Sequence, residues 1–421
     1  MAARSYFVDG RHEALRADVR RFAREVVAPR VASMESHRQV DHELSRAIAR
    51  QGWIGVTIPR HYGGMGAGHS AKTVIIEELS RVSGAMGAMA QASQLGVAKV
   101  LHFGSEAQKA YWLPAFASGE SLPTIAVTEP DSGGHVLAMT GTARRDGDEY
   151  VLNGRKWFVG NSHIGDVHGV VLRTGEGSTG LSAFLVETDR PGFRLGETGD
   201  PFGLHGFSFG EIIFEDCRLP AANRLGEEGQ GLEVAYSSSL LYGRPNLTAV
   251  ALGIHTAVLA DTVAFARDRR LYGKPLGELP TINAKIGGMQ SRLMTARLAA
   301  YHATHLLDHG QPCDAELINA KLINAEYALD SARDAIEIHA ARGLQRTHNI
   351  ERYYRDAAHI YAPAGTSDIQ RHRLGQLALG AYGQQWSQQL ATHTGSTGPE
   401  SPPDRRRADA QEPAASDSLA S

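Results

Sequence analysis

The stretch Tyr150-Val-Leu-Asn-Gly-Arg-Lys-Trp-Phe-Val159 lies in the middle part of the chain and indicates β-strands in the region around it. Two short β-branched and aromatic runs flank Asn153-Gly154, and an Asn-Gly pair in that setting is typical of a β-hairpin turn. Similar runs, separated by glycines, continue on both sides. The runs that indicate strands are Thr124–Thr128, Tyr150–Leu152, Val170–Leu172, Leu181–Val186 and Ile212–Phe214. The sequence therefore predicts a middle β domain over 122–228.

Helical periodicity stands on either side of this β domain. Within an N-terminal helical domain over 1–121, the predicted helices are Arg11–Ala32, Ala71–Arg81, Met86–His102 and Ala107–Leu113. After the β domain, apolar residues at Leu322, Ala325, Leu329, Ala332 and Ile336 alternate spacings of three and four. That alternation is typical of a bundle seam. We expect four long helices within Gly231–Leu390, in a C-terminal domain over 229–392.

The end of the chain differs in composition from the rest. Residues 393–421 are rich in Gly, Ser, Pro, Ala and charge, which predicts a disordered tail. Arg405–Arg407 within it favours a solvated segment over a binding patch. Pattern alone thus predicts an α+β protein with a C-terminal helical bundle.

Composition excludes several classes of protein. Lys plus Arg total 43 and Asp plus Glu total 46, so a net charge of −3 excludes a strongly basic nucleic-acid binder. Cys217 and Cys313 lack metal-site spacing and favour a reducing cytoplasm. No apolar run reaches about 18 residues, and the first thirty residues contain no signal-peptide core. We expect a cytoplasmic protein with no metal, no nucleic-acid partner and no membrane span.

Several short motifs are informative when taken together. They are Tyr62-Gly-Gly-Met-Gly, Glu77-Glu-Leu-Ser-Arg, Gln108-Lys109, Val127-Thr-Glu-Pro-Asp-Ser-Gly-Gly, Asn153-Gly-Arg-Lys, Phe214-Glu-Asp-Cys-Arg-Leu-Pro, Leu225-Gly-Glu-Glu-Gly-Gln-Gly, Gly243-Arg, Arg269-Arg-Leu-Tyr-Gly-Lys-Pro-Leu, Tyr354-Arg-Asp-Ala and Gly365-Thr-Ser-Asp-Ile-Gln-Arg. Each is weak alone. In this order and at these spacings, the chain resembles the acyl-CoA dehydrogenase family from about residue 10 to about residue 385.

The resemblance implies a fold and a set of partners. The fold is an N-terminal helical domain, a central β-barrel-like domain and a C-terminal four-helix bundle, with FAD between the last two. The substrate is an acyl group on CoA or on an acyl-carrier protein. Electrons pass to an acceptor protein or to O2. Family members assemble as homodimers or homotetramers.

Four residues match positions around the flavin ring, which needs hydrogen bonds and flat apolar contacts. Val127 and Thr128 match the positions that contact the isoalloxazine. Phe158 stands where the family places a tryptophan beside the flavin, although a core phenylalanine is an equal alternative. Gly160 replaces a threonine near flavin N5.

Four more residues match the phosphate and adenosine half, where positive charge is needed. Arg269 matches the arginine that reaches the diphosphate of FAD bound by a neighbouring subunit, and a plain surface cation is the alternative. Gly134 replaces a phosphate-binding serine, which weakens the resemblance. Thr366 and Asp368 match positions near the adenosine.

The catalytic base of the family is missing. The family reaction uses a glutamate to remove the substrate α-proton, and a base must be held within reach of that carbon. At its two known positions this chain has Ala364 and Gly243. Tyr242, Tyr361 and His205 are weak substitutes.

Two residues match the substrate pocket. Arg244 follows Gly243 and matches an arginine beside the acyl-thioester cavity, with a buried structural arginine as the alternative. Tyr242 is a further candidate for lining that cavity, although a core tyrosine is the commoner outcome.

Three functions follow. The first is an FAD-dependent acyl-thioester dehydrogenase of a specialised pathway that uses an unusual base. The second is a flavin-dependent oxygenase or oxidase on the same fold, which needs no α-proton base because reduced flavin reacts with O2. The third is a redox-silent subunit or a non-redox catalyst. The surviving motifs favour the first, and the missing glutamate favours the others.

Overall fold

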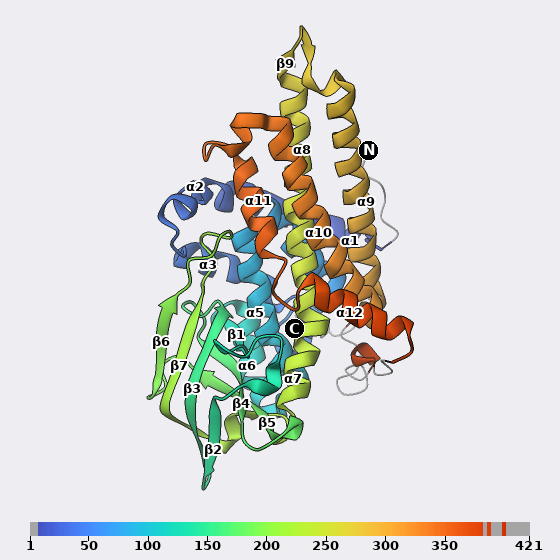
Figure 1. The fold of residues 1–421 in the computed structure, drawn as a ribbon. Helices are drawn as coiled ribbons and strands as arrows, with labels where there is room; N and C mark the ends of the chain where they lie inside the picture. The colour runs from blue at the N-terminus through green and yellow to red at the C-terminus, as the bar shows by residue number, and fades with distance from the viewer. Residues whose placement is uncertain (1–6, 382–384, 389–397, 401–421) are drawn as a thin grey trace, which may run out of the picture.

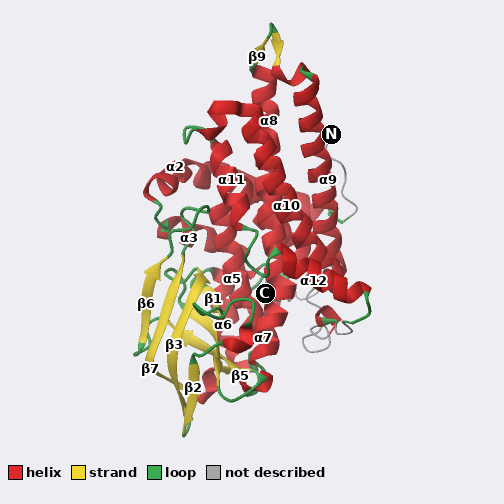
Figure 2. Cartoon of the chain, viewed as in Figure 1, coloured by secondary structure: helices red, strands yellow, loops and turns green. Residues whose placement is uncertain are grey.

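The chain folds in the order helices, sheet, helices (Figure 1). The computed structural model describes residues 7–381, 385–388 and 398–400. The sheet occupies one end of the molecule, and the long C-terminal helices run from beside it to the opposite end (Figure 2). Most of the predicted tail, 393–397 and 401–421, lies outside the described residues. Within the described part, Glu400 donates its amide to the Gly66 carbonyl at 2.8 Å.

The N-terminal domain is helical, as predicted. Its elements are α1 (Gly10–Phe22), the π-helical turn η1 (Ala23–Val27), α2 (Ala28–His37), α3 (His42–Ala49), η2 (Trp53–Gly55), η3 (Arg60–Tyr62), α4 (Gly68–Val82), α5 (Gly84–Phe103) and α6 (Glu106–Ser118). Ser83 caps α5 by accepting the Met86 amide at 3.3 Å. Ser105 and Gln108 form a capping box at the start of α6.

The middle domain is one eight-stranded sheet. Its strands are β1 (Pro123–Ala126), β2 (Thr142–Asp146), β3 (Glu149–Gly160), β4 (Val167–Arg173), β5 (Leu181–Glu187), β6 (Phe193–Thr198), β7 (Phe209–Pro220) and β8 (Arg224–Leu225). The order is β6-β7-β3-β2-β4-β5-β8, with β1 parallel to β4. The two-residue β8 therefore ends the sheet on the side of β5.

The hairpin predicted at Asn153-Gly154 is wrong. β3 runs unbroken through both residues, and the chain turns instead between β2 and β3, where Asp146 pairs with Glu149. Gly154 has φ +137°, and a methyl on it would lie 2.7 Å from Gly141 Cα. The pairing of β3 with β7 shifts between Leu152 and Gly154. The glycine thus serves a β-bulge and a close backbone approach rather than a turn.

The C-terminal domain is a helical bundle with a projecting arm. Its elements are α7 (Gly231–Ser238), the π-helical turn η7 (Ser239–Gly243), α8 (Arg244–Asp268), β9 (Arg270–Leu271), β10 (Lys274–Pro275), η8 (Leu276–Glu278), α9 (Pro280–Asp308), α10 (Asp314–His339), η9 (Ala340–Leu344), α11 (Asn349–His359) and α12 (Ser367–Ala378). Three bundle helices are long, but α11 has only 11 residues. The predicted four-helix bundle is confirmed as α8, α9, α10 and α11, but its fourth helix is shorter than expected, because α11 ends at His359, before the Tyr361–Gly365 turn.

One helical stretch, Gly231–Asp268, is long and apolar enough to cross a membrane by length and composition. Its most apolar window is 67% buried inside the protein. Within α8, residues such as Leu252, Ile254 and Val258 are fully buried. The apolar composition is accounted for by burial inside the bundle, since a helix covered on all sides carries apolar residues all round.

Lys99 of α5 is a buried cation. Its side chain is fully buried against the sheet, because a methyl on Gly169 of β4 would lie 2.5 Å from Lys99 Cδ. Among the described residues, its Nζ has no hydrogen-bond partner. Burial, followed by repulsion from Lys156, lowers the pKa of Lys99 to about 7. An unpaired buried amine of this kind destabilises the fold.

We predict that Lys99→Met stabilises the protein by about 2–4 kcal/mol at pH 7. The folded pKa lies below the unfolded value of about 10.4, so the charge opposes folding fully below pH 7. This penalty shrinks as pH rises from 7 toward about 10.4. Thermal unfolding of wild type and variant at pH 6 and pH 9.5 measures this penalty. The stability of Lys99→Met relative to wild type should increase more at pH 6 than at pH 9.5. A variant that melts below wild type at pH 6 contradicts the prediction.

The matched control for this experiment is Lys156→Met. Lys156 is also fully buried, but its Nζ lies 2.7 Å from Glu129 Oε1. Removing it leaves a buried carboxylate without its cation, which costs about 3–5 kcal/mol. The two lysine variants should therefore change stability in opposite directions.

Candidate functional site

The two positions that the family uses for a base meet in space. Gly243 ends the π-helical turn before α8, and Ala364 lies in the turn between α11 and α12. A methyl placed on Gly243 would lie 3.4 Å from Ala364 Cβ and 3.7 Å from Leu95 Cδ2 of α5. π-helical turns occur frequently at functional sites. The contact among these three residues is the centre of the candidate site, and none of them carries an ionisable group.

The flavin-side position Gly160 lies next to the same helix. A methyl on Gly160 would lie 3.0 Å from Ala92 Cβ and 3.0 Å from Phe207 Cζ. Ala92 precedes Leu95 by one turn of α5, so the two share a helix face. The Gly160 carbonyl accepts the Thr124 hydroxyl at 2.5 Å. Helix α5 therefore connects the end of β3 with the contact between Gly243 and Ala364.

An aromatic group borders Gly160. Phe158 has φ +58° and is 53% exposed, which is unusual for a bulky residue in both respects. Its ring centroid lies 5.9 Å from that of Trp157 and 5.6 Å from that of Phe209. Strained backbone of this kind gathers at functional sites. Phe158 therefore presents an aromatic face to solvent instead of joining the core.

His359 belongs to the same aromatic group and was missed by the sequence analysis. Its ring packs edge-on against Phe209, with centroids 5.3 Å apart. Burial lowers the pKa of His359 to about 4, so the imidazole is neutral at pH 7. Its position five residues before Ala364 is the signal that points to it, because α11 ends directly before the turn.

The main chain around Thr128 is tied to β3. The Trp157 amide donates to the Thr128 carbonyl at 2.9 Å, and Lys156 Nζ donates to the Val127 carbonyl at 3.2 Å. Burial alone would raise the pKa of Glu129, but Lys156 and two backbone amides lower it. At Gly134 an added methyl would meet no atom within 4 Å. The segment is thus hydrogen-bonded to β3 beside Phe158 and open at Gly134.

These observations test whether the residues fit FAD. A flat ring system needs an exposed aromatic or apolar face beside ordered main-chain groups, and Phe158 next to Thr128 supplies both. The open space at Gly134 leaves room for a phosphate. The residues present therefore fit the cofactor that the motifs predict.

Tyr242 is engaged in a buried polar cluster. Its hydroxyl lies 3.0 Å from His102 Nε2, and Lys72 Nζ lies 4.1 Å from the centre of its ring. Burial raises the pKa of Tyr242 and lowers that of His102 to about 3. A phenol held neutral in this way donates a hydrogen bond but accepts a proton poorly, which argues against Tyr242 as the base.

The other two substitutes are also engaged elsewhere. The Tyr361 hydroxyl donates to Glu326 Oε1 at 3.3 Å. Both ring nitrogens of His205 have partners: Glu35 and Arg355 face Nδ1 at 3.1 and 3.2 Å, and the Pro201 carbonyl faces Nε2 at 3.2 Å. Both groups are thus hydrogen-bonded to other residues of the fold.

Arg244 lies directly beside the central contact and is buried. Its Nε donates to Gln370 Oε1 at 2.9 Å. Gln370 in turn donates to the carbonyls of Ala364 and Gly365. Arg244 therefore lies next to the centre of the site, where it contacts the residue that holds the turn.

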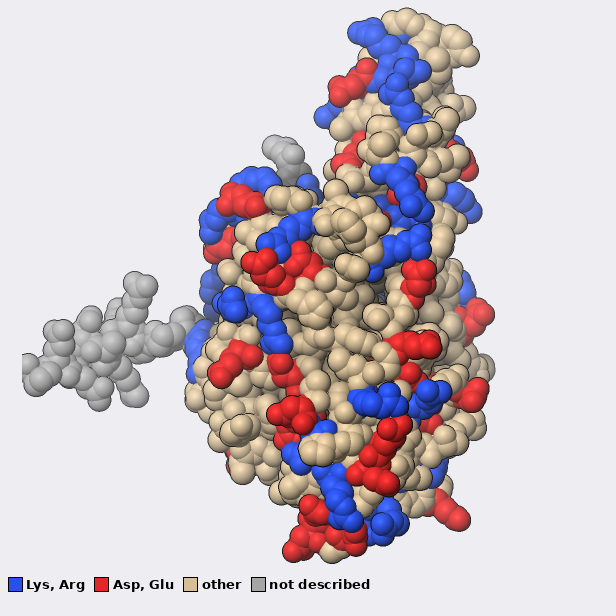
Figure 3. Space-filling view, turned by 90° about the vertical axis from the view of Figure 1, so that its left-hand side faces the viewer, with Lys and Arg blue, Asp and Glu red and all other residues tan. Residues whose placement is uncertain are grey.

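The residues matched to the phosphate half lie apart from this centre. Arg269 sits at the base of the β9–β10 arm, which projects at the top of the molecule in Figure 1. Figure 3 shows Lys and Arg side chains gathered on this arm, where Arg269, Arg270 and Lys274 are exposed, as is Arg267 at the end of α8. Thr366 caps α12 by accepting the Ile369 amide at 3.4 Å. The Asp368 side chain is exposed and pairs with Arg371 at 3.4 Å.

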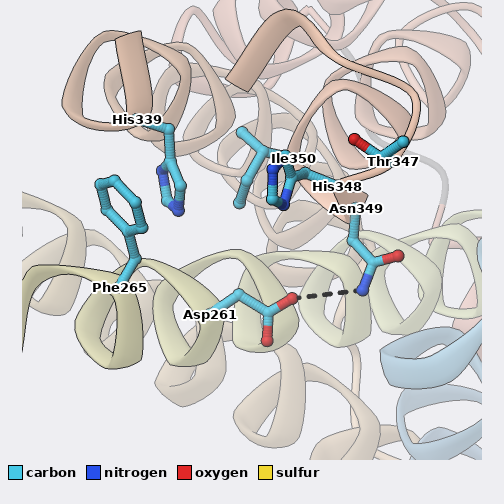
Figure 4. Close-up of a pocket in the computed structure, with 7 residues that line it drawn as sticks. All are labelled: Asp261, Phe265, His339, Thr347, His348, Asn349 and Ile350. Atoms are coloured by element: carbon cyan, nitrogen blue, oxygen red, sulfur yellow. Dashed lines mark hydrogen bonds between the residues drawn. The ribbon is translucent and has the colours of Figure 1, made fainter. Parts of the chain in front are cut away.

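A separate hollow of about 240 Å³ lies between α8, α10 and α11. Figure 4 shows His339 stacked on Phe265, with ring centroids 4.1 Å apart, and Asn349 reaching toward Asp261. The Tyr353 hydroxyl also donates to Asp261 at 3.0 Å.

Among the described residues, no three His, Cys, Asp or Glu side chains gather as a metal site requires. Both cysteines are buried and free of disulfides.

Three family models match the chain in succession. They are the acyl-CoA dehydrogenase N-terminal domain over residues 9–120, the middle domain over 124–217 and the C-terminal domain over 229–379. An acyl-CoA dehydrogenase of Bacillus subtilis (strain 168) is 35% identical, covering 87% of this chain and 97% of its own length. A 3-(aryl)acrylate reductase of Clostridium sporogenes (strain ATCC 15579) is 33% identical with the same coverage.

Solved structures agree with this similarity. Butyryl-CoA dehydrogenase from Megasphaera elsdenii superposes with a TM-score of 0.86 at 29% identity, covering 88% of this chain and 99% of its own. The prolyl acyl carrier protein oxidase AnaB gives 0.84 at 28% identity, with 88% and 99% coverage. The FAD complex of PigA gives 0.85 at 28% identity, with 89% and 99% coverage.

Proposed function

The chain belongs to the acyl-CoA dehydrogenase family, and from that membership we propose that it oxidises an acyl thioester at a site whose two usual base positions carry no carboxylate. The family makes it an FAD-dependent oxidoreductase acting on a CH–CH group. The observation that carries the finer proposal is the contact among Gly243, Ala364 and Leu95. A thioester α-carbon bound there meets only apolar groups at the positions where relatives hold the base.

We assign the cofactor to the face formed by Phe158, Gly160 and the main chain of Val127 and Thr128. FAD supplies the hydride acceptor when it is bound. Gly134, Thr366 and Asp368 are the proposed contacts of its phosphate and adenosine half. The exposed aromatic face of Phe158 and the open space at Gly134 support this assignment.

The substrate-binding residues proposed here are Arg244 and Tyr242. Arg244 is buried next to Gly243 and carries a permanent charge, which suits orientation of a thioester carbonyl. Tyr242 is proposed from its place directly before Gly243, and it is fully buried. The acyl carrier is CoA or a carrier protein, in keeping with butyryl-CoA dehydrogenase and AnaB among the structural relatives. The electron acceptor is a protein or O2.

The lack of a carboxylate at Gly243 and Ala364 also favours two other functions. A flavin-dependent oxygenase or oxidase needs no base at the substrate α-carbon, and a redox-silent subunit or non-redox catalyst needs none either. The absence of a carboxylate at both Gly243 and Ala364 suits these functions as well as it suits a dehydrogenase with an unusual base. Reduction by thioesters separates them.

We predict that Ala364→Glu increases the rate at which acyl-CoAs reduce the bound FAD. A positioned general base contributes about 10²–10⁴-fold, and the variant should recover part of that factor. The measurement is the anaerobic loss of visible flavin absorbance with butyryl-, octanoyl- and branched acyl-CoA. Ala364→Gln is the matched control, since it has the same size and no basic carboxylate.

Other outcomes of this experiment are equally decisive. Fast reduction of wild type that neither variant changes means that another residue is the base, and His359 is then the next to replace. If no thioester reduces any of the three proteins while FAD is bound, the dehydrogenase proposal fails and the oxygenase or redox-silent alternative takes its place.

We predict that Arg269→Ala weakens FAD binding. A charge-assisted hydrogen bond to a diphosphate contributes about 1.5–3 kcal/mol, and Arg269 is exposed on an arm that reaches away from its own sheet. Titration of the apoprotein by flavin fluorescence measures the affinity. Arg267→Ala, in the last turn of α8 beside the arm, is the control and should bind like wild type. Equal affinity of the Arg269 variant and wild type contradicts this role.

We also propose a homodimer or homotetramer formed through the C-terminal domain. Met294 and Leu298 stand one turn apart on α9, and each is 61% exposed. Light scattering of the full chain should give two or four copies, and a chain ended at Thr392 should assemble identically. A monomeric full chain contradicts the proposal.

We further propose domain boundaries at 121, 228 and 392, which the bounds of the three family models support. We also propose a cytoplasmic location, which the two free buried cysteines support.

A further inference from the structure

The turn that carries Ala364 has a strained backbone. Ala364 has φ +56° and Gly365 has φ +95°, so two successive residues adopt left-handed conformations. Glycine adopts this region freely, but a residue with a Cβ in a sparsely populated conformation costs about 1–3 kcal/mol. Such a conformation persists only where surrounding contacts hold it. The structure shows what these contacts are.

Gln370 of α12 holds the end of the turn. Its side chain is fully buried, and its Nε2 donates to the Ala364 carbonyl at 2.9 Å and to the Gly365 carbonyl at 3.0 Å. Its Oε1 accepts from Arg244 Nε at 2.9 Å. The bond from Arg244 orients the amide, so that Nε2 faces the two carbonyls.

Lys321 of α10 holds the turn from the other side. It is fully buried, and its Nζ donates to the Tyr361 carbonyl at 2.9 Å and to the Gly365 carbonyl at 2.8 Å. Burial, followed by repulsion from Arg244, lowers the pKa of Lys321 to about 8 against the attraction of Glu326. A buried ammonium is costly unless it is hydrogen-bonded. Its bonds to both ends of the turn provide that compensation.

We propose that Lys321 and Gln370 are positioning residues that fix the backbone of the Tyr361–Gly365 turn and thereby aim the side chain of residue 364 at Gly243. All four of their bonds to the turn end on main-chain carbonyls. The clamp therefore acts whatever side chain residue 364 carries. It holds the geometry of the turn although residue 364 carries no carboxylate. The inference rests on the proposed function for the importance of the 364–243 contact, but the clamp itself rests on these bonds.

The first test measures the turn directly in the full FAD-loaded chain. Lys321→Met keeps the length of the side chain and removes its donors. We expect amide hydrogen exchange at residues 361, 362 and 364–366 to rise at least tenfold, with exchange in the middle of α10 and in α8 unchanged. Lys99→Met is the matched control, because it also removes a buried lysine but contacts no part of the turn. Unchanged exchange at 361–366 in Lys321→Met overturns the proposal.

The second test measures coupling to residue 364. If the clamp aims that side chain, the rate gained by Ala364→Glu should fall at least tenfold when Lys321→Met is added, with KM for the thioester changed less than twofold. A merely structural role would lower the rate equally with and without the glutamate. Lys321→Arg, which keeps the donors, should retain more of the gain than Lys321→Met. An equal gain in both backgrounds overturns the positioning role.

The two tests also separate this inference from the proposed function. Hydrogen exchange decides whether the clamp holds the turn, and it needs no substrate. Thioester-dependent loss of flavin absorbance decides whether the site performs dehydrogenation. Loosened exchange in Lys321→Met together with no reduction of any variant would reject the dehydrogenase proposal and leave the clamp as the device that holds this turn.

Discussion

Close packing of helix α5 is the constraint on which the rest of the structure depends. All of its residues except Leu95 and Phe103 are buried, so the helix has no face toward solvent. A methyl on Gly96 would lie 2.5 Å from the Thr124 amide nitrogen of β1. Glycine at this position allows the helix to rest on strand backbone, and a larger residue would push the sheet away. The sheet, the helix and the bundle are thereby held at fixed separations.

The packing of α5 also sets the geometry of the site. Ala92 of α5 lies next to Gly160 of β3, and Leu95 of α5 lies next to Gly243. Small residues at these points bring β3, α5 and α8 close together. A rigid scaffold of this kind can lose a catalytic side chain without losing the shape around it, because the shape depends on backbone contacts. The Ala364 turn, held by Lys321 and Gln370, has the same property.

Buried charge is distributed unevenly in the core. Lys156 and Lys321 have their bonds satisfied by a carboxylate or by carbonyls, whereas Lys99 has no hydrogen-bond partner among the described residues. Paired groups of this kind specify geometry, because a shift of either partner leaves a buried group without its bond. Lys99 does not contribute in that way. Lys156 and Lys321 therefore hold the backbone of the site, whereas Lys99 only lowers stability.

The sequence by itself determined the order of helices and strands, the three domains and the identity of every residue at the motif positions. The lack of a carboxylate at Gly243 and Ala364 follows from the sequence alone, because it is a matter of residue identity. Local periodicity predicted α4, α5 and α6, because the apolar face of a helix follows from spacing along the chain. The Asn153-Gly154 hairpin failed because a close approach by Gly141 outweighs the local turn preference.

Only the tertiary structure decided which distant residues meet. It brought Gly243, Ala364 and Leu95 into one contact, occupied both ring nitrogens of His205, and placed His359 against Phe209. None of these facts leaves a periodic signal in the chain, because each depends on the packing of elements that are far apart in sequence. The strained φ of Ala364 is of the same kind: alanine does not favour it, and bonds from α10 and α12 impose it.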